Sequence, residues 1–253
     1  MQNSDSPNQE IRPTTNALAD LFVESMNNTS ITKHIRIPEP VTWLRAVVSA
    51  IPYVGGPFDH LLFDKANAIR LKNIEATIAA LSDQIARTNE EALDKHWFDT
   101  EEAVAAFKIL SDKVSYEPDK AKVDALGRVV GTFGTKKNSG DPAKLSVIEH
   151  LSKLSSVQIH LLASVAVTPI QKKDFSTGGL RQSVTAVWLI DIADTLRKDT
   201  SFWSGELNLV QEFEVLEAFN VVRRVQLFGH TEIGYVLSSL GKRAASYVRE
   251  AGL

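Results

Sequence analysis

The chain has 253 residues, of which 43% are hydrophobic and 23% are charged, and its formal net charge at pH 7 is −3. A chain of this length can bury a large apolar core without disulfides, and its composition is that of an ordinary globular protein. The sequence contains no cysteine, which excludes disulfides, thiolate zinc sites and cysteine nucleophiles. The weakly negative charge provides no general attraction to nucleic acid or to anionic lipid.

The first 14 residues are polar and contain two prolines, and they predict a disordered tail. They lack the basic start and the apolar run of a signal peptide. No stretch of the chain approaches the roughly 20 apolar residues of a membrane-spanning helix. We therefore expect a cytoplasmic protein.

The segment from Val41 to Phe63 is an apolar helical pattern interrupted by PYVGGP at 52–57. Two prolines and two glycines cannot continue a helix, so the segment predicts a hairpin. Its large apolar side chains include Trp43, Val47, Val48, Phe58, Leu61 and Leu62. The hairpin could insert into a membrane or bind a partner. Its short halves and its charged Arg45, Asp59 and Asp64 favour a buried role within a helical bundle.

A seam of apolar residues follows within a helix predicted over 57–89. The seam residues are spaced three or four apart and are Leu71, Ile74, Ile78, Leu81 and Ile85. Two heptads are too few to require a coiled-coil dimer, so we expect packing against a neighbouring helix of the same chain. Helices are also predicted from the capping residues at Asp99-Thr100 and from about Asp119 to Val130. Together these elements predict a helical bundle over 15–133.

Residues 134–140 are glycine-rich and polar, and they predict a linker to a second domain over 141–253. Helices are predicted near 143–154 and 156–166, a loop at 168–179, and further helices at 180–197 and about 206–219. A strand at 221–227, a turn, a strand at 232–236 and a helix at 240–248 complete the chain. This order is typical of a winged-helix-like domain with a small β-wing. Ser238 is expected to cap the last helix, and Gly241 is expected to permit close packing.

A winged helix that reads DNA needs basic or amide side chains on its third helix. The candidate helix instead carries Glu206, Glu212, Glu214 and Glu217, and residues 141–253 hold 12 basic and 12 acidic side chains. The domain therefore resembles an interaction module more than a DNA reader. A basic patch for nucleic acid or a partner protein remains as an alternative, and it would consist of Arg223, Arg224, Lys242, Arg243 and Arg249.

No phosphate-loop, dinucleotide-binding, zinc-protease or hydrolase motif occurs in the sequence. His60 and Asp64 lie one helical turn apart, but no third metal ligand is near, so we predict no metal site. Asp191 and Asp194 could be catalytic acids, but Arg197 provides Asp194 with an ordinary helical ion-pair partner. We therefore predict no catalytic residue, no cofactor and a protein that is not an enzyme.

Four segments, IPYVGGP, FKILSDKVSYEPDKAKVDALGRVV, VIEHLSKLSSVQIHLLASV and LSSLGKRAASYV, carry a family resemblance. In this order they resemble bacterial helical proteins of the Abi-alpha type, over about residues 41–250. The resemblance implies a mainly α fold with a winged-helix-like end and a role in phage defence, and it carries no catalytic residues. We expect a regulatory or scaffolding protein that acts through protein contacts. A DNA-binding regulator and a membrane-active helical effector are the alternatives.

Overall fold

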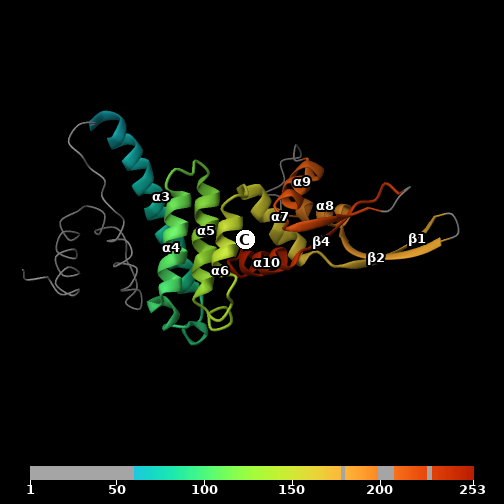
Figure 1. Ribbon diagram of the computed structural model, residues 1–253, viewed down its shortest axis with the longest axis horizontal. Helices are drawn as coiled ribbons and strands as arrows, with labels where there is room; N and C mark the ends of the chain where they lie inside the picture. The colour runs from blue at the N-terminus through green and yellow to red at the C-terminus, as the bar shows by residue number, and fades with distance from the viewer. Residues whose placement is uncertain (1–59, 178–179, 199–207, 227–229) are drawn as a thin grey trace, which may run out of the picture. The chain divides into compact units, whose positions relative to one another are not determined.

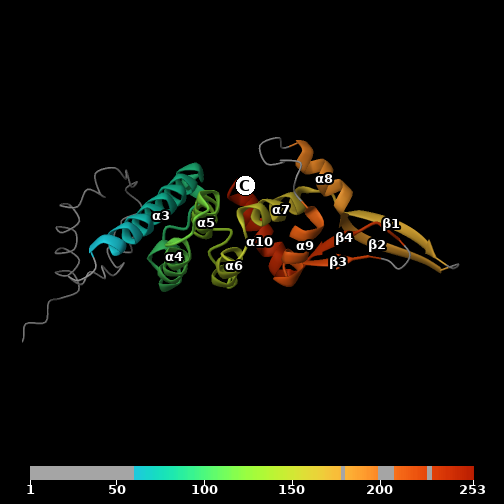
Figure 2. The ribbon, with the colours of Figure 1, turned by 90° about the horizontal axis from the view of Figure 1, so that it is seen from above.

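Apolar residues at helical spacing build the helices that precede the sheet in the described part of the chain, and these helices pack side by side in the computed structural model (Figures 1 and 2). The structure describes residues 60–177, 180–198, 208–226 and 230–253, all within the unit Pro57–Leu253. The helices before the sheet are α3 (His60–Arg87), α4 (Glu101–Val114), α5 (Lys120–Phe133), α6 (Lys144–Leu151) and α7 (Ser156–Val167). Two short 3₁₀ helices, η3 (Glu90–Ala92) and η4 (Trp97–Asp99), connect α3 to α4.

The predicted apolar seam of α3 packs against α5, so its intramolecular role is confirmed. Ile74, Ile78, Leu81 and Ile85 are buried, and Leu71 is half-buried. The helix starts expected for α4 and α5 are also confirmed. The Thr100 hydroxyl accepts a hydrogen bond from the Ala103 N–H, and the Asp119 carboxylate accepts from two N–H groups of the first turn of α5.

A buried lysine joins three of these elements. The Lys144 side chain is completely buried at the start of α6, and its ammonium lies 2.7 Å from the Glu102 carboxylate on α4. The indole N–H of Trp97, in η4, donates to the same carboxylate at 2.6 Å, and the ammonium lies 5.0 Å from the Trp97 ring centroid. A buried ammonium must be paired and hydrogen-bonded to remain charged, and here both conditions are met.

The remaining elements form a four-stranded antiparallel sheet with helices on it, in the strand order β1-β2-β4-β3. The strands are β1 (Gln171–Thr177), β2 (Leu180–Trp188), β3 (Val222–Val225) and β4 (Gly234–Leu237). The helices are α8 (Leu189–Lys198), α9 (Leu209–Ala218) and α10 (Ser239–Glu250). The described chain is therefore mainly helical with a small sheet, as predicted, and the predicted strand pair near 221–236 is confirmed.

Two predicted elements are wrong. Residues 168–179 are not a loop, because most of them form β1, and residues 180–197 are not one helix, because they form β2 followed by α8. The end of β2 is buried on both faces, so consecutive residues there are apolar instead of alternating with polar ones. As a result Val187 and Trp188 lie three and four residues after Val184, which is also the spacing of a helix. Such a short apolar run does not distinguish a strand from a helix. Ile190, in the first turn of α8, is 55% exposed.

Segment 134–140 is tied to its surroundings by hydrogen bonds. The Asp94 N–H donates to the Gly134 carbonyl at 2.8 Å, and the Lys136 N–H donates to the Ala92 carbonyl at 2.7 Å. The buried Asn138 amide donates to the Glu250 carboxylate on α10 at 2.7 Å. A Cβ on Gly134 would lie 2.1 Å from the Phe98 ring, which explains the glycine. The division of the chain into domains at this segment stays a prediction.

Candidate functional site

The five residues of the predicted basic patch lie on two different surfaces. Lys242, Arg243 and Arg249 lie on the exposed face of α10, and Arg223 is exposed on β3. The Arg224 side chain points to the opposite face of the sheet, where its guanidinium lies 4.0 Å from the Glu214 carboxylate, and the backbone N–H of Arg224 donates to the Glu217 carboxylate at 2.9 Å. Both acids belong to α9, so the charge of Arg224 is balanced there and does not extend the patch.

Two predicted features hold α10 in place. The Ser238 hydroxyl caps the helix by accepting a hydrogen bond from the Gly241 N–H at 2.9 Å. A Cβ on Gly241 would lie 1.9 Å from the Val221 carbonyl oxygen, so only glycine allows this approach. Val221 directly precedes β3, so this contact places the start of β3 beside the first turn of α10. Arg223 is the second residue of β3 and follows Val221 by two positions.

The acids near α10 are held by neighbouring groups. Asp141 accepts hydrogen bonds from Arg243, at 2.5 Å, and from the Tyr247 hydroxyl, at 2.9 Å. Glu250 accepts from Lys137 and from Asn138. Both carboxylates are therefore held between α10 and the segment before Pro142.

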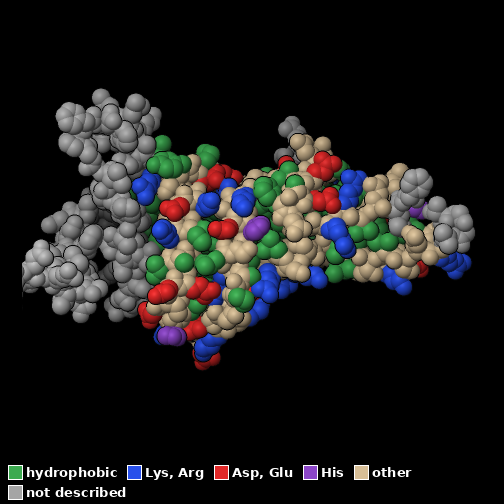
Figure 3. All heavy atoms as spheres, in the orientation of Figure 1, with side chains coloured by type: hydrophobic (Ala, Val, Ile, Leu, Met, Phe, Trp, Pro, Cys, Tyr) green, Lys and Arg blue, Asp and Glu red, His purple; other side chains and the backbone are tan. Residues whose placement is uncertain are grey.

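A basic surface runs along α10, and we name it the α10 basic face. Its members are Lys136, Lys137, Arg223, Lys242, Arg243 and Arg249. Asp141 and Glu250 offset two of these six charges, so the face retains a local surplus of positive charge. Figure 3 shows basic side chains gathered along the lower edge of that view, below the place of α10 in Figure 1.

Helix α9, which stands third in the predicted winged helix, presents acids to solvent. Glu214 is exposed, while Glu212 accepts a hydrogen bond from Gln158 at 2.9 Å and Glu217 accepts from the Arg224 N–H. The helix contains no lysine or arginine. Basic and acidic side chains are equal in number over 141–253, but they are unevenly distributed: α9 has an acidic surface and α10 has a basic one.

Strands β1 and β2 form a two-stranded arm, because only Val187 and Trp188 of β2 pair with β4. One face of the arm is organised around Trp188. The Lys173 ammonium lies 4.6 Å from the centroid of the Trp188 ring and 2.7 Å from the Glu232 carboxylate. The centroids of the Phe175 and Trp188 rings are 5.5 Å apart. The other face carries exposed polar side chains, which are Lys172, Asp174, Ser176, Arg181, Ser183 and Thr185.

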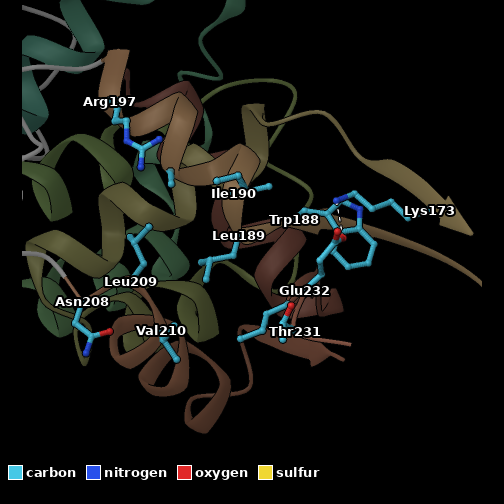
Figure 4. A pocket seen from close by; sticks show the side chains of 12 residues that line it. Lys173, Trp188, Leu189, Ile190, Arg197, Asn208, Leu209, Val210, Thr231 and Glu232 are labelled. Carbon is cyan, nitrogen blue, oxygen red and sulfur yellow. Dashed lines mark hydrogen bonds and ion pairs between the residues drawn. The ribbon is translucent and has the colours of Figure 1, made fainter. Parts of the chain in front are cut away.

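A groove of about 400 Å³ lies at the base of this arm (Figure 4). Its wall is mainly apolar, with Trp188 and Leu189 on one side and Leu209 and Val210 from α9 on another. Lys173 and Glu232 lie toward one end, and Arg197 and Asn208 lie toward the other. Sequence reasoning missed this groove because it treated 180–197 as a single helix.

The candidate catalytic and metal-binding residues form no site in the described part of the chain. Arg197 pairs with Asp194 at 2.6 Å, as predicted, and one oxygen of Asp191 is buried without a hydrogen bond. No group of three or more metal-binding side chains occurs among the described residues. His60 and Asp64 begin α3, but their side chains lie outside the described set.

The predicted apolar hairpin also lies mostly outside the described residues. Trp43, Val47, Val48 and Phe58 precede the described chain, and the side chains of Leu61 and Leu62, at the start of α3, are not described either. Across the described helices, none combines the length and the hydropathy needed to cross a membrane. The membrane-active alternative therefore stays a prediction.

Comparison of the chain with protein-family models, curated proteins and solved structures finds no significant match.

The environment of Tyr247 predicts a loss of stability in alkali. Burial raises the pKa of the Tyr247 hydroxyl, and the hydrogen bond to Asp141 raises it further; burial also raises the pKa of Tyr235. Above about pH 10 the unfolded chain loses protons that the folded chain keeps, so the free energy of unfolding falls as pH rises. Each tyrosine contributes at most about 1.4 kcal/mol per pH unit.

Urea unfolding of the wild type and of Tyr247→Phe between pH 8 and pH 11 measures this effect. Above about pH 10 the free energy of unfolding of the variant is expected to fall less steeply with pH, because Tyr235 is then the one of these two buried tyrosines that remains. Equal slopes in the two proteins would contradict the assignment.

Proposed function

We propose that this chain is a non-enzymatic regulatory or scaffolding protein whose C-terminal part is a winged-helix-like module that binds a partner protein. The order from α7 to β4 is helix, arm, two helices and two strands, and the sheet order β2-β4-β3 places the last strand in the middle. This order supports a winged-helix-like arrangement. The resemblance to Abi-alpha-type proteins supports a role in phage defence.

The observation that carries the proposal is the position of β1 at the edge of the sheet. In an antiparallel pair, alternate residues direct their N–H and C=O groups away from the neighbouring strand. Along the outer side of β1, no other strand of the described chain pairs with these groups. An extended segment of a partner can therefore add to the sheet as a further strand, with main-chain hydrogen bonds providing affinity.

The acidic face of α9 argues against base reading by this helix. Glu214 would face the phosphates of a DNA groove, and α9 has no basic side chain to contact them. Protein contact through the arm is therefore the function that we favour for this part of the chain.

Lysines added to β1 test the proposal, because charge on an edge strand opposes further strand pairing. Asp174→Lys with Ser176→Lys changes two exposed positions of the edge strand, and Gln182→Lys with Ser183→Lys places two lysines on the neighbouring strand of the arm. Each protein would carry a photo-crosslinking residue at Lys172 and be irradiated in native cells. We expect the yield of crosslinked partner to fall at least about tenfold in the β1 variant, because its edge strand no longer pairs. The β2 variant should give the same yield as the wild type.

Equal crosslinking by the two variants, or no crosslinked protein with the wild type, would contradict strand addition at β1. Light scattering of the purified wild type then establishes whether the partner is a second copy of the chain.

A further inference from the structure

We propose that the α10 basic face binds the phosphate backbone of a nucleic-acid duplex, without reading its sequence. The face is separate from the β1 edge that the proposed function uses. It is carried by α10, by the segment before Pro142 and by one residue of β3. The binding would involve only the exposed cations and hydroxyls of these elements.

The first support is that the acids of this region are already engaged. Asp141 is bound by Arg243 and Tyr247, and Glu250 is bound by Lys137 and Asn138. No acidic partner of Lys136, Arg223, Lys242 or Arg249 is found within the described residues. These cations are therefore available to an external anion, although the chain as a whole is weakly negative.

The second support is the spacing of the cations. Lys242 and Arg249 are seven residues apart on one side of α10, which corresponds to about 10 Å along the helix axis. Phosphates on one strand of a duplex are spaced about 3.4 Å apart along the duplex axis. The two side chains therefore span about three phosphates. Arg223 beyond one end of α10 and Lys137 beyond the other extend the row.

The third support is the kind of side chain between the cations. Ser239 provides an exposed hydroxyl, a common donor to phosphate, whereas the Ser246 hydroxyl donates to the Glu250 carboxylate at 3.3 Å. The exposed large hydrophobic residues of the described chain all lie on other elements, and Tyr247 is buried. Side-chain interfaces between proteins are commonly centred on apolar or aromatic anchors, and single-stranded nucleic acid commonly stacks on exposed aromatic side chains. A duplex backbone needs neither.

The test measures fluorescence anisotropy of a labelled 20-base-pair duplex of mixed sequence with the full-length protein. At about 50 mM salt we expect a dissociation constant in the micromolar range. If three to four phosphates are contacted, raising the salt to about 200 mM should weaken binding roughly 40- to 150-fold. A duplex of unrelated sequence should bind equally well, because no base is contacted.

The decisive variant is Lys242→Glu with Arg249→Glu, because both side chains are exposed and neither is in an ion pair with a described residue. It should bind at least about tenfold more weakly, since two phosphate contacts become repulsive. The matched control is Lys108→Glu with Lys113→Glu, which makes the same charge change at exposed positions of α4. The control should bind as the wild type does, and thermal unfolding confirms that both variants fold.

Three results would overturn the proposal. The first is that the wild type does not bind the duplex at about 50 mM salt. The second is that the α10 variant binds the duplex no more weakly than the α4 variant does. The third is that the wild type binds polyglutamate more tightly than it binds the duplex. The last result would assign the face to an acidic protein instead. None of these measurements depends on the β1 edge, so the proposed function stands or fails separately.

Discussion

Replacing Lys144 by methionine is expected to lower the free energy of unfolding by about 3–5 kcal/mol. The substitution removes the only ammonium that the structure shows against Glu102 in the described chain, while the Glu102 carboxylate stays partly buried with the Trp97 indole as its remaining partner. A charge left in such a site without a counter-ion retains most of its desolvation penalty. Urea unfolding at pH 7 measures the loss.

Two companion variants distinguish this cause from a loss of packing. Lys95→Met removes an ammonium from an exposed pair with Glu90, so it should leave the free energy of unfolding almost unchanged. The double variant Lys144→Met with Glu102→Gln removes both charges and should recover part of the loss. A loss below about 1 kcal/mol for Lys144→Met alone would show that the buried pair has little effect on stability.

The substitution Gly241→Ala is the second large effect, with an expected cost of about 3 kcal/mol. The new Cβ would lie 1.9 Å from the Val221 carbonyl oxygen and 2.9 Å from its carbon, and this neighbour is backbone, which cannot rotate away. Helix α10 would have to move off β3, where the Ser238 N–H also donates to the Val221 carbonyl at 3.0 Å. The unfolding midpoint in urea should fall accordingly.

Gly140→Ala is the matched control, because a Cβ at this position meets no atom within 4 Å. It should change the free energy of unfolding by less than about 0.5 kcal/mol. If the two alanine variants were equally stable, the close approach of α10 to β3 would be wrong.

The helical part of the fold was predictable because its signals are local. The seam from Leu71 to Ile85 has a clear period, and Thr100, Asp119 and Ser238 are capping residues whose side chains act within one turn. Strand β2 was not predictable from period alone, because its end is buried on both faces. The Gly178-Gly179 pair, followed by a run that contains the β-branched residues Val184, Thr185 and Val187, was the signal for a hairpin.

The candidate surfaces were predictable only in part, because charge depends on tertiary partners. Arg223 and Arg224 are neighbours in sequence, yet alternation along β3 sends them to opposite faces and only Arg224 reaches the acids of α9. Lys136 and Lys137 adjoin each other in the sequence, but their place beside α10 depends on contacts more than 100 residues away, such as that of Lys137 with Glu250. Local patterns carry no information about such pairs.

Helix α10 packs mainly against α7 and α5 and makes smaller contacts with α6 and β4, so it connects the helices to the sheet. The Gln84 amide on α3 also reaches the Glu250 carbonyl, at 3.1 Å. Because α10 packs against both groups of elements, neither the helices nor the sheet can open alone without exposing the apolar side of α10. Native-state hydrogen exchange should therefore find α5, α7 and α10 opening together as one cooperative unit, with the β1–β2 arm exchanging earlier.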